Sequence, residues 1–124
     1  MLKKEVVKGS GGRVVLMDSI TKVTPDDNGS IVVCASHGGA SSGEFALEVP
    51  LKLVVFNDAG IAALEMLQDR GVAGATVAHT SGRIGDSLDM WENGVLSHVN
   101  AKARELGLAD GARVRQVLSE LVKH

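Results

Sequence analysis

The sequence predicts one α/β domain over residues 1–124, with a mixed sheet, parallel βαβ units and helices covering it. The first observation is the apolar run IVVCA at residues 31–35, because an unbroken apolar strand is typical of a sheet buried on both faces. The second is a strand–helix–strand pattern with short links over residues 51–78, which indicates a parallel pair of strands. The length of 124 residues fits one domain of ordinary size.

The first part of the chain is expected to contain an arm, two strands and a turn. Residues 1–12 combine a charged tip with KGSGG, which favours a turn or a loose N-terminal arm. Residues 13–23 are rich in β-branched side chains, which favours a strand with a break near Asp18. TPDDNG at residues 24–29 is a turn signal, so the first strand is expected to form an antiparallel hairpin or a sharp corner with residues 30–36.

The remaining elements are expected to alternate along the chain. The clearest is a helix at residues 59–70, with apolar residues at helical spacing, Asn57 or Asp58 as its cap and Gly71 as its end. A later short helix is expected to turn Leu88 and Trp91 to the same side, with Trp91 in the core or in a subunit contact. The other expected elements are a helix at residues 43–49, strands at 51–56 and 72–78, and helices at 86–92, at 95–106 and after Asp110.

Composition and charge exclude several classes of function. Aromatic residues make up 2% of the chain and the net charge is −2, so the basic patch and stacking platforms of a nucleic-acid-binding protein are missing. No apolar run is long enough for a membrane helix, and the N-terminus has no signal-peptide core, so no membrane partner is expected. The single cysteine, Cys34, fits a reducing compartment and inert core packing, and the expected location is cytoplasmic.

Polar residues follow three of the predicted strands. The second predicted strand is followed by His37, the third by Asn57 and Asp58, and the fourth by His79 and Thr80. The carboxyl ends of parallel strands lie along one edge of a sheet, where ligands bind, so these side chains are expected to converge on one site. The alternative is that they are polar only because strand ends reach solvent.

The turn between residues 38 and 43 allows three interpretations. The N–H groups of Gly38 and Gly39, with the hydroxyls of Ser41 and Ser42, could bind a phosphate or a carboxylate. The same residues match G-x-S-x-G, the motif of a small serine-type hydrolase. The third interpretation is a plain tight turn.

Two further kinds of ligand contact were weighed. Arg83 lies just past the last predicted strand and could bind an anionic ligand with two parallel hydrogen bonds, or could be an ordinary surface residue. Imidazole and carboxylate groups from His37, Asp58 and His79 suit Zn²⁺ or Mn²⁺, but their spacing matches no metal motif. No metal site is therefore predicted, and the sequence identifies no cofactor.

The C-terminal half carries a pattern of glycine, apolar and charged residues. The matching residues are Gly60, Ala63, Leu64, Leu67, Arg70-Gly71-Val72-Ala73-Gly74, Leu88-Asp89, Ala103, Glu105-Leu106-Gly107, Gly111, Arg115 and Leu118. This part of the chain resembles the YunC-like uncharacterised conserved proteins. The resemblance implies a compact α/β fold of roughly this length, and it transfers no functional residue.

Two functional hypotheses follow from the sequence. The first is a site for a small polar or anionic molecule at the strand ends, with His37, Asp58 and His79 as acid–base groups. Its other expected ligand contacts are Gly38, Gly39, Ser41, Ser42, Asn57, Thr80 and Arg83. The second is a non-catalytic module that forms a homo-oligomer or binds an enzyme subunit through its apolar helices.

Overall fold

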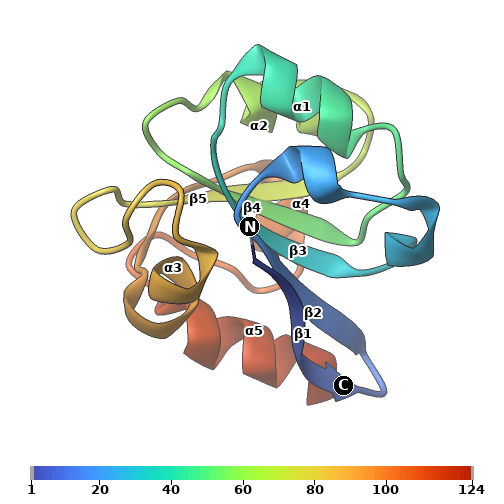
Figure 1. The fold of residues 1–124 in the computed structure, drawn as a ribbon, viewed down its shortest axis with the longest axis vertical. Helices are drawn as coiled ribbons and strands as arrows, with labels where there is room; N and C mark the ends of the chain where they lie inside the picture. The colour runs from blue at the N-terminus through green and yellow to red at the C-terminus, as the bar shows by residue number, and fades with distance from the viewer. Residues whose placement is uncertain (1, 124) are drawn as a thin grey trace.

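The computed structural model describes residues 2–123, and within this range six strands form one mixed sheet in the order of the chain (Figure 1). Strands β2 to β5 run parallel, whereas β1 and β6 pair antiparallel at the two outer edges. The predicted α/β fold with parallel strands is confirmed. The strands are β1 Lys3–Gly9, β2 Gly12–Met17, β3 Ile31–His37, β4 Leu53–Asn57, β5 Ala73–Val77 and β6 Leu96–Val99.

Helices cover both faces of the sheet. Helices α1 and α2 pack together over one face, and α3 and α5 lie over the other (Figure 1). The short 3-10 helices η1 (Ile20–Lys22) and η2 (Pro25–Asp27) link β2 to β3. The α-helices are α1 Ala40–Ala46, α2 Ala62–Asp69, α3 Ser87–Asn93, α4 Ala101–Glu105 and α5 Val114–Lys123.

Alternate residues of β3 belong to two separate apolar clusters. Ile31 and Val33 pack in the cluster that includes Leu118 of α5. Val32 and Cys34 pack in the cluster on the opposite face, under α1 and α2. Because both faces of β3 are buried, every residue from Ile31 to Ala35 is apolar, as the sequence pattern predicted.

Two predictions about the N-terminal part are wrong. Residues 3–9 are strand β1 rather than a loose arm, although the turn predicted in KGSGG does form at residues 10 and 11, and β1 forms the antiparallel hairpin with β2. The expected hairpin between residues 13–23 and 30–36 does not form, because η1 and η2 return the chain to the start of a parallel strand, β3. The exposed charges of β1 suggested an arm, but charged side chains are also typical of an edge strand.

The predicted helix at residues 95–106 is also wrong. Residues 96–99 form β6, and only Ala101–Glu105 are helical. The side-chain oxygen of Asn100 accepts hydrogen bonds from the N–H groups of Gly74 and Ala103, so it joins the end of β6 to β5 and also caps α4. These long-range contacts outweigh the helical spacing of the local sequence.

Several helix boundaries and orientations differ from the predictions. Helix α1 begins at Ala40 instead of residue 43, and α2 begins at Ala62 instead of residue 59. Gly71, at a φ of 74°, follows the end of α2 as predicted. In α3, Trp91 is 5% exposed and lies in the chain's own core, whereas Leu88 is 41% exposed instead of facing inward with it.

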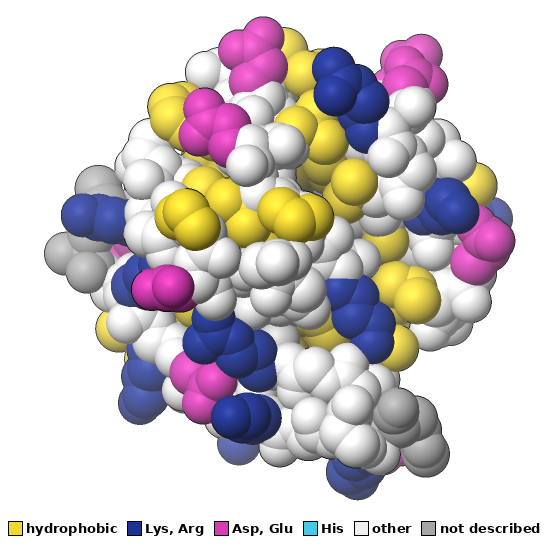
Figure 2. All heavy atoms as spheres, turned by 90° about the vertical axis from the view of Figure 1, so that its right-hand side faces the viewer, with side chains coloured by type: hydrophobic (Ala, Val, Ile, Leu, Met, Phe, Trp, Pro, Cys, Tyr) yellow, Lys and Arg dark blue, Asp and Glu magenta, His cyan; other side chains and the backbone are white. Residues whose placement is uncertain are grey.

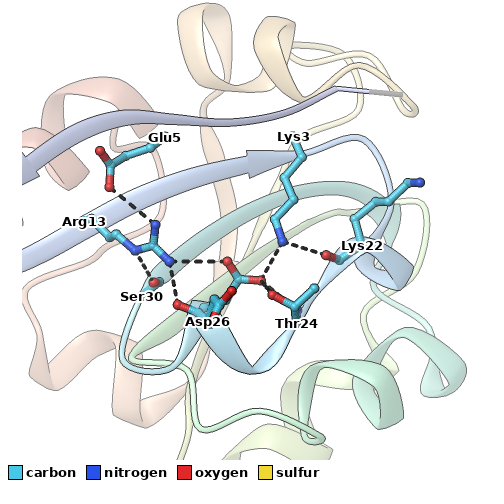
Figure 3. Close-up of polar contacts among 8 residues, drawn as sticks. Lys3, Glu5, Arg13, Lys22, Thr24, Asp26 and Ser30 are labelled. Carbon is cyan, nitrogen blue, oxygen red and sulfur yellow. Dashed lines mark hydrogen bonds and ion pairs between the residues drawn. The ribbon is translucent and has the colours of Figure 1, made fainter.

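Charged residues gather at the amino edge, which is the edge of the sheet where β3, β4 and β5 begin. Figure 3 shows Lys3 and Arg13 reaching toward η2, where the buried carboxylate of Asp27 lies 2.9 Å from Lys3 Nζ and 3.4 Å from an Arg13 nitrogen. Salt bridges and capping contacts therefore fasten this edge.

The face of the molecule in Figure 2 mixes acidic, basic and hydrophobic side chains, and no histidine of the described residues is visible on it.

A search for membrane-spanning helices among residues 2–123 finds none that is both long and apolar enough.

Candidate functional site

The parallel strands carry three polar residues to the opposite edge, called here the carboxyl edge, which faces left in Figure 1. His37 is the last residue of β3, Asp58 directly follows β4, and His79 lies two residues after β5. His37 pairs with Asn57 in the sheet, and Asn57 pairs with Val77. The shared direction of the strands, rather than closeness in sequence, brings these residues to one edge.

Asp58 and His79 are in direct contact. The Oδ1 atom of Asp58 lies 2.8 Å from Nδ1 of the His79 ring, and it also accepts a hydrogen bond of 2.9 Å from the His79 backbone N–H. The Asp58 side chain is 13% exposed and the His79 side chain is 67% exposed. The carboxylate is therefore largely shielded, while most of the imidazole ring reaches solvent.

The protonation state of Asp58 determines what its partner can do. Burial raises the pKa of Asp58, but hydrogen bonds from the His79 ring, the His79 backbone and Ser97 outweigh it, so the pKa lies below its usual range. At neutral pH the ionised carboxylate only accepts hydrogen bonds, so Nδ1 of His79 must carry the proton. In the neutral ring Nε2 therefore carries no proton and can accept one, as in a histidine that transfers protons.

His37 lies apart from this pair. A side chain added at Gly39 would come within 2.9 Å of the His37 ring, and one at Gly60 within 3.4 Å. The exposed ring thus packs against the backbone of two glycine-containing turns. Among the described residues no hydrogen bond connects His37 to Asp58 or His79, so the edge contains one bonded pair and a separate histidine.

The loop after β5 forms a hollow beside His79. Its volume is about 350 Å³, and it is lined by His79, Thr80, Ser81, Gly82, Arg83, Ile84 and Asp89. Two bonds fix the loop: Asn57 Nδ2 donates to the Gly82 carbonyl at 2.9 Å, and the Gly85 N–H donates to the Ala35 carbonyl at 3.0 Å. Asn57 is fully buried, so it supports the loop instead of lining the hollow as a ligand contact.

The serines of the glycine-rich turn lie inside a helix. Ser41 and Ser42 are the second and third residues of α1, and Ser42 is only 6% exposed. A nucleophile elbow needs its serine on the turn between strand and helix, hydrogen-bonded to a histidine. Neither serine is hydrogen-bonded to a histidine among the described residues, and α1 is only seven residues long. The hydrolase and anion-cradle interpretations thus gain no structural support.

A second carboxylate at this edge has a structural role that the sequence did not indicate. Asp18, just past β2, accepts hydrogen bonds from the backbone and the hydroxyl of Ser87 at 3.0 and 2.8 Å, and from the Leu2 N–H at 2.8 Å. Burial raises the pKa of Asp18, but these hydrogen bonds keep it below its usual range. Asp18 therefore fastens the start of α3 to the end of β2.

Metal and thiol chemistry find little support in the described residues. Within residues 2–123 no group of three histidine, cysteine, aspartate or glutamate side chains is arranged to bind a metal ion. Cys34 is fully buried in β3, and burial raises the pKa of its thiol far above the usual range. Cys34 is therefore an inert core residue, as expected.

Three polar residues of β5 and β6 contact one another, and two of them, Thr76 and Ser97, were not predicted as site residues. Thr76 Oγ1 lies 2.9 Å from Ser97 Oγ and 3.2 Å from His98 Nδ1, and Ser97 Oγ lies 3.2 Å from the same nitrogen. Ser97 and His98 belong to β6, which the sequence pattern assigned to a helix. With only four residues, Leu96–Val99, this strand is too short for a regular alternation of apolar and polar residues to reveal it.

Comparisons of the sequence with models of known protein families, with curated proteins and with solved structures give no match. A functional proposal for this chain therefore depends on the geometry of the carboxyl edge.

Proposed function

We propose that the protein binds a small polar or anionic metabolite in the hollow beside β5 and that His79 exchanges a proton with it. The observation that carries this proposal is the Asp58–His79 contact of 2.8 Å, in which the carboxylate is shielded and the ring is exposed. Asp58 directs Nδ1 inward and leaves Nε2 for the ligand. When Nε2 accepts a proton, the carboxylate stabilises the resulting imidazolium.

The hollow also contains groups that favour an anionic ligand. The guanidinium of Arg83 is exposed, and the exposed Thr80 lies beside His79. Asp89 also lines the hollow and accepts a hydrogen bond of 2.9 Å from the Arg83 N–H, which orients the loop. Hydrogen bonds from Asn93 and the Arg83 backbone lower the pKa of Asp89. Arg83 and a protonated His79 would provide two positive groups for one ligand anion.

The test is a binding screen on the intact chain. The probes are inorganic phosphate, simple mono- and dicarboxylates and the corresponding uncharged amides, followed by ¹⁵N–¹H NMR and by the thermal unfolding midpoint. We expect at least one anion to shift signals of residues 79–84. His79→Gln should weaken that binding by about tenfold or more, which corresponds to about 1.4 kcal/mol, without lowering the unfolding midpoint.

Two further variants complete the design. Arg115→Gln changes an exposed residue of α5 and should leave binding unchanged. His37→Ala tests whether the separate histidine of the same edge also contacts the ligand. The proposal is wrong if none of the anions shifts residues 79–84, or if His79→Gln binds them as tightly as the native chain.

A further inference from the structure

An apolar side chain, Ile84, is held at the surface beside the functional pair. Ile84 is 49% exposed, and it lines the hollow that His79 and Arg83 also line. Of the side chains that line this hollow, Ile84 alone is a pure hydrocarbon. Single exposed isoleucines are common on protein surfaces, so the exposure by itself assigns Ile84 no role.

The backbone on both sides of Ile84 is fixed by hydrogen bonds. The Arg83 N–H donates to Asp89 Oδ2 at 2.9 Å, and the Gly85 N–H donates to the Ala35 carbonyl at 3.0 Å. Gly85 has a φ of 83°, a left-handed conformation that glycine adopts at little cost, so the chain turns directly after Ile84. A ligand that contacts Ile84 therefore meets a loop that is already fixed, which lowers the entropic cost of binding.

The loop backbone packs directly on the core two residues before Ile84. Gly82 is buried, and a Cβ there would come within 2.9 Å of Met90 and within 3.0 Å of Val77. Met90 and Val77 are themselves fully buried. The backbone at Gly82 thus covers this part of the core, whereas the Ile84 side chain contributes apolar surface to the hollow.

The charges around the hollow match a ligand with a single negative charge. At neutral pH Arg83 is positive and Asp89 is negative, while His79 is positive only after it takes up a proton. These three side chains therefore sum to zero or to one positive charge. The Asp89 oxygens already accept from the Arg83 N–H and, at 2.8 Å, from Asn93 Nδ2. A second carboxylate on the ligand would meet the negative charge of Asp89 without a cation to compensate it.

We propose that the ligand of the hollow is a monocarboxylate with a short hydrocarbon chain, and that Ile84 contacts this chain. The inference rests on the proposed function, in which Arg83 and His79 receive the anionic group. It adds that the adjoining part of the ligand is apolar, because contact with Ile84 removes apolar surface of both partners from water. The volume of about 350 Å³ lies near the lower end of the usual range for ligand sites, so the chain is short.

The first experiment compares acetate, butyrate and succinate in ¹⁵N–¹H NMR titrations of the intact chain, followed at residues 79–84. Butyrate is two methylenes longer than acetate and should bind about fourfold more tightly, since a half-covered methylene contributes about a factor of two. Succinate has the carbon chain of butyrate with a second carboxylate in place of the methyl group, and it should bind more weakly than butyrate. The proposal is overturned if acetate and butyrate bind equally, or if succinate binds more tightly than butyrate.

The second experiment tests whether the preference for butyrate depends on Ile84. Ile84→Thr keeps the branched Cβ but replaces apolar surface with a hydroxyl, so it should bind acetate as the native chain does and lose most of the fourfold preference. Ile84→Val keeps a hydrocarbon side chain and should retain the preference. The control is Ile61→Thr, because Ile61 is 48% exposed but does not line the hollow, and both affinities should stay unchanged. An equal preference in the native and Ile84→Thr chains would exclude the contact.

The inference and the proposed function fail in different ways. If acetate and butyrate bind equally and His79→Gln weakens both, the proposed function stands and the hydrocarbon chain is excluded. If no carboxylate shifts the signals of residues 79–84, both are wrong. A dimer in size-exclusion chromatography that Ile84→Thr dissociates, with no preference for butyrate, would make Ile84 a contact between copies of the chain and would overturn the inference alone.

Discussion

Two aspartates at opposite edges of the sheet have different surroundings. At the amino edge, the carboxylate of Asp27 is 3% exposed and contacts Lys3, Arg13 and the Thr24 N–H, so both of its oxygens are used (Figure 3). At the carboxyl edge, the Asp58 side chain is 13% exposed, and its main partner is a histidine that is 67% exposed. The partners of the two carboxylates therefore differ in whether they keep an atom free to bind a ligand.

This difference separates a structural carboxylate from a candidate functional one. Lys3 also donates to the Lys22 carbonyl, and Arg13 to Ser30 and the Asp26 carbonyl, so the cations around Asp27 are committed to the fold. Among residues 2–123, the His79 ring is hydrogen-bonded only through Nδ1, which leaves Nε2 for a ligand. Burial of a carboxylate is thus a weaker indication of function than a free hydrogen-bonding atom on the side chain that the carboxylate orients.

The largest effect on stability is expected at the amino edge. Asp27→Asn removes the charge that compensates Lys3 and Arg13, whose side chains are 31% exposed. Breaking a buried pair from one side costs about 3 kcal/mol, at the low end of the usual range because these cations reach solvent. Urea unfolding at pH 7 measures this loss.

The adjacent Asp26 provides a matched control. Its side chain is exposed and only its carbonyl takes part in the network, so Asp26→Asn should change the free energy of unfolding by less than about 0.5 kcal/mol. If the two variants were equally stable, the contacts of Asp27 would not fasten the amino edge, and Asp27 could no longer be contrasted with Asp58 as a structural carboxylate.

The sequence allowed the sheet to be predicted where burial alone determines the pattern. Strands β3, β4 and β5 were predicted because residues such as Val32 and Val54 are apolar on both faces of a parallel sheet. The edge strands were not, since β1 is largely exposed and β6 is short. Their conformation depends on pairing with β2 and β5, which local propensity does not encode.

The candidate site was predictable to a similar extent. Strand direction placed Asp58 and His79 at one edge, and the structure shows them in contact. Their bond could not be derived from the sequence, where Asp58 looked equally suited to cap α2. The contact of Ser97 with Thr76 could not be derived either, because Ser97 lies in β6, a strand that the sequence pattern did not indicate.

An intermediate loss of stability is expected when a glycine of the carboxyl edge, rather than one of the amino edge, is replaced by alanine. A Cβ at Gly38 would overlap the carbonyl oxygen of Gly60, whereas Gly29, at the amino edge, has open space around it and a φ of 76°. Gly38→Ala should therefore cost about 2 to 3 kcal/mol through overlap of two backbones. Gly29→Ala should cost only about 1 kcal/mol, through its left-handed conformation. Equal losses in thermal unfolding would mean that close backbone contact does not define the carboxyl edge.

A smaller effect on stability than for Asp27→Asn or Gly38→Ala, with the largest effect on the site, is expected for Asp58→Asn. The folded-state pKa of Asp58 lies below the ordinary value of 3.8, so its stabilising contribution is complete above that value and is lost as the pH falls through the folded pKa. At pH 7 the variant should be less stable by about 1 kcal/mol, because the asparagine carbonyl still accepts the His79 backbone N–H. This difference should disappear in acid below the folded pKa.

The neutral amide no longer requires the proton on Nδ1, so the ¹⁵N signals of His79 should show a mixture of tautomers at neutral pH. A stability loss as large as that of Asp27→Asn, with the His79 tautomer unchanged, would make Asp58 a second structural carboxylate and remove the distinction between the two edges.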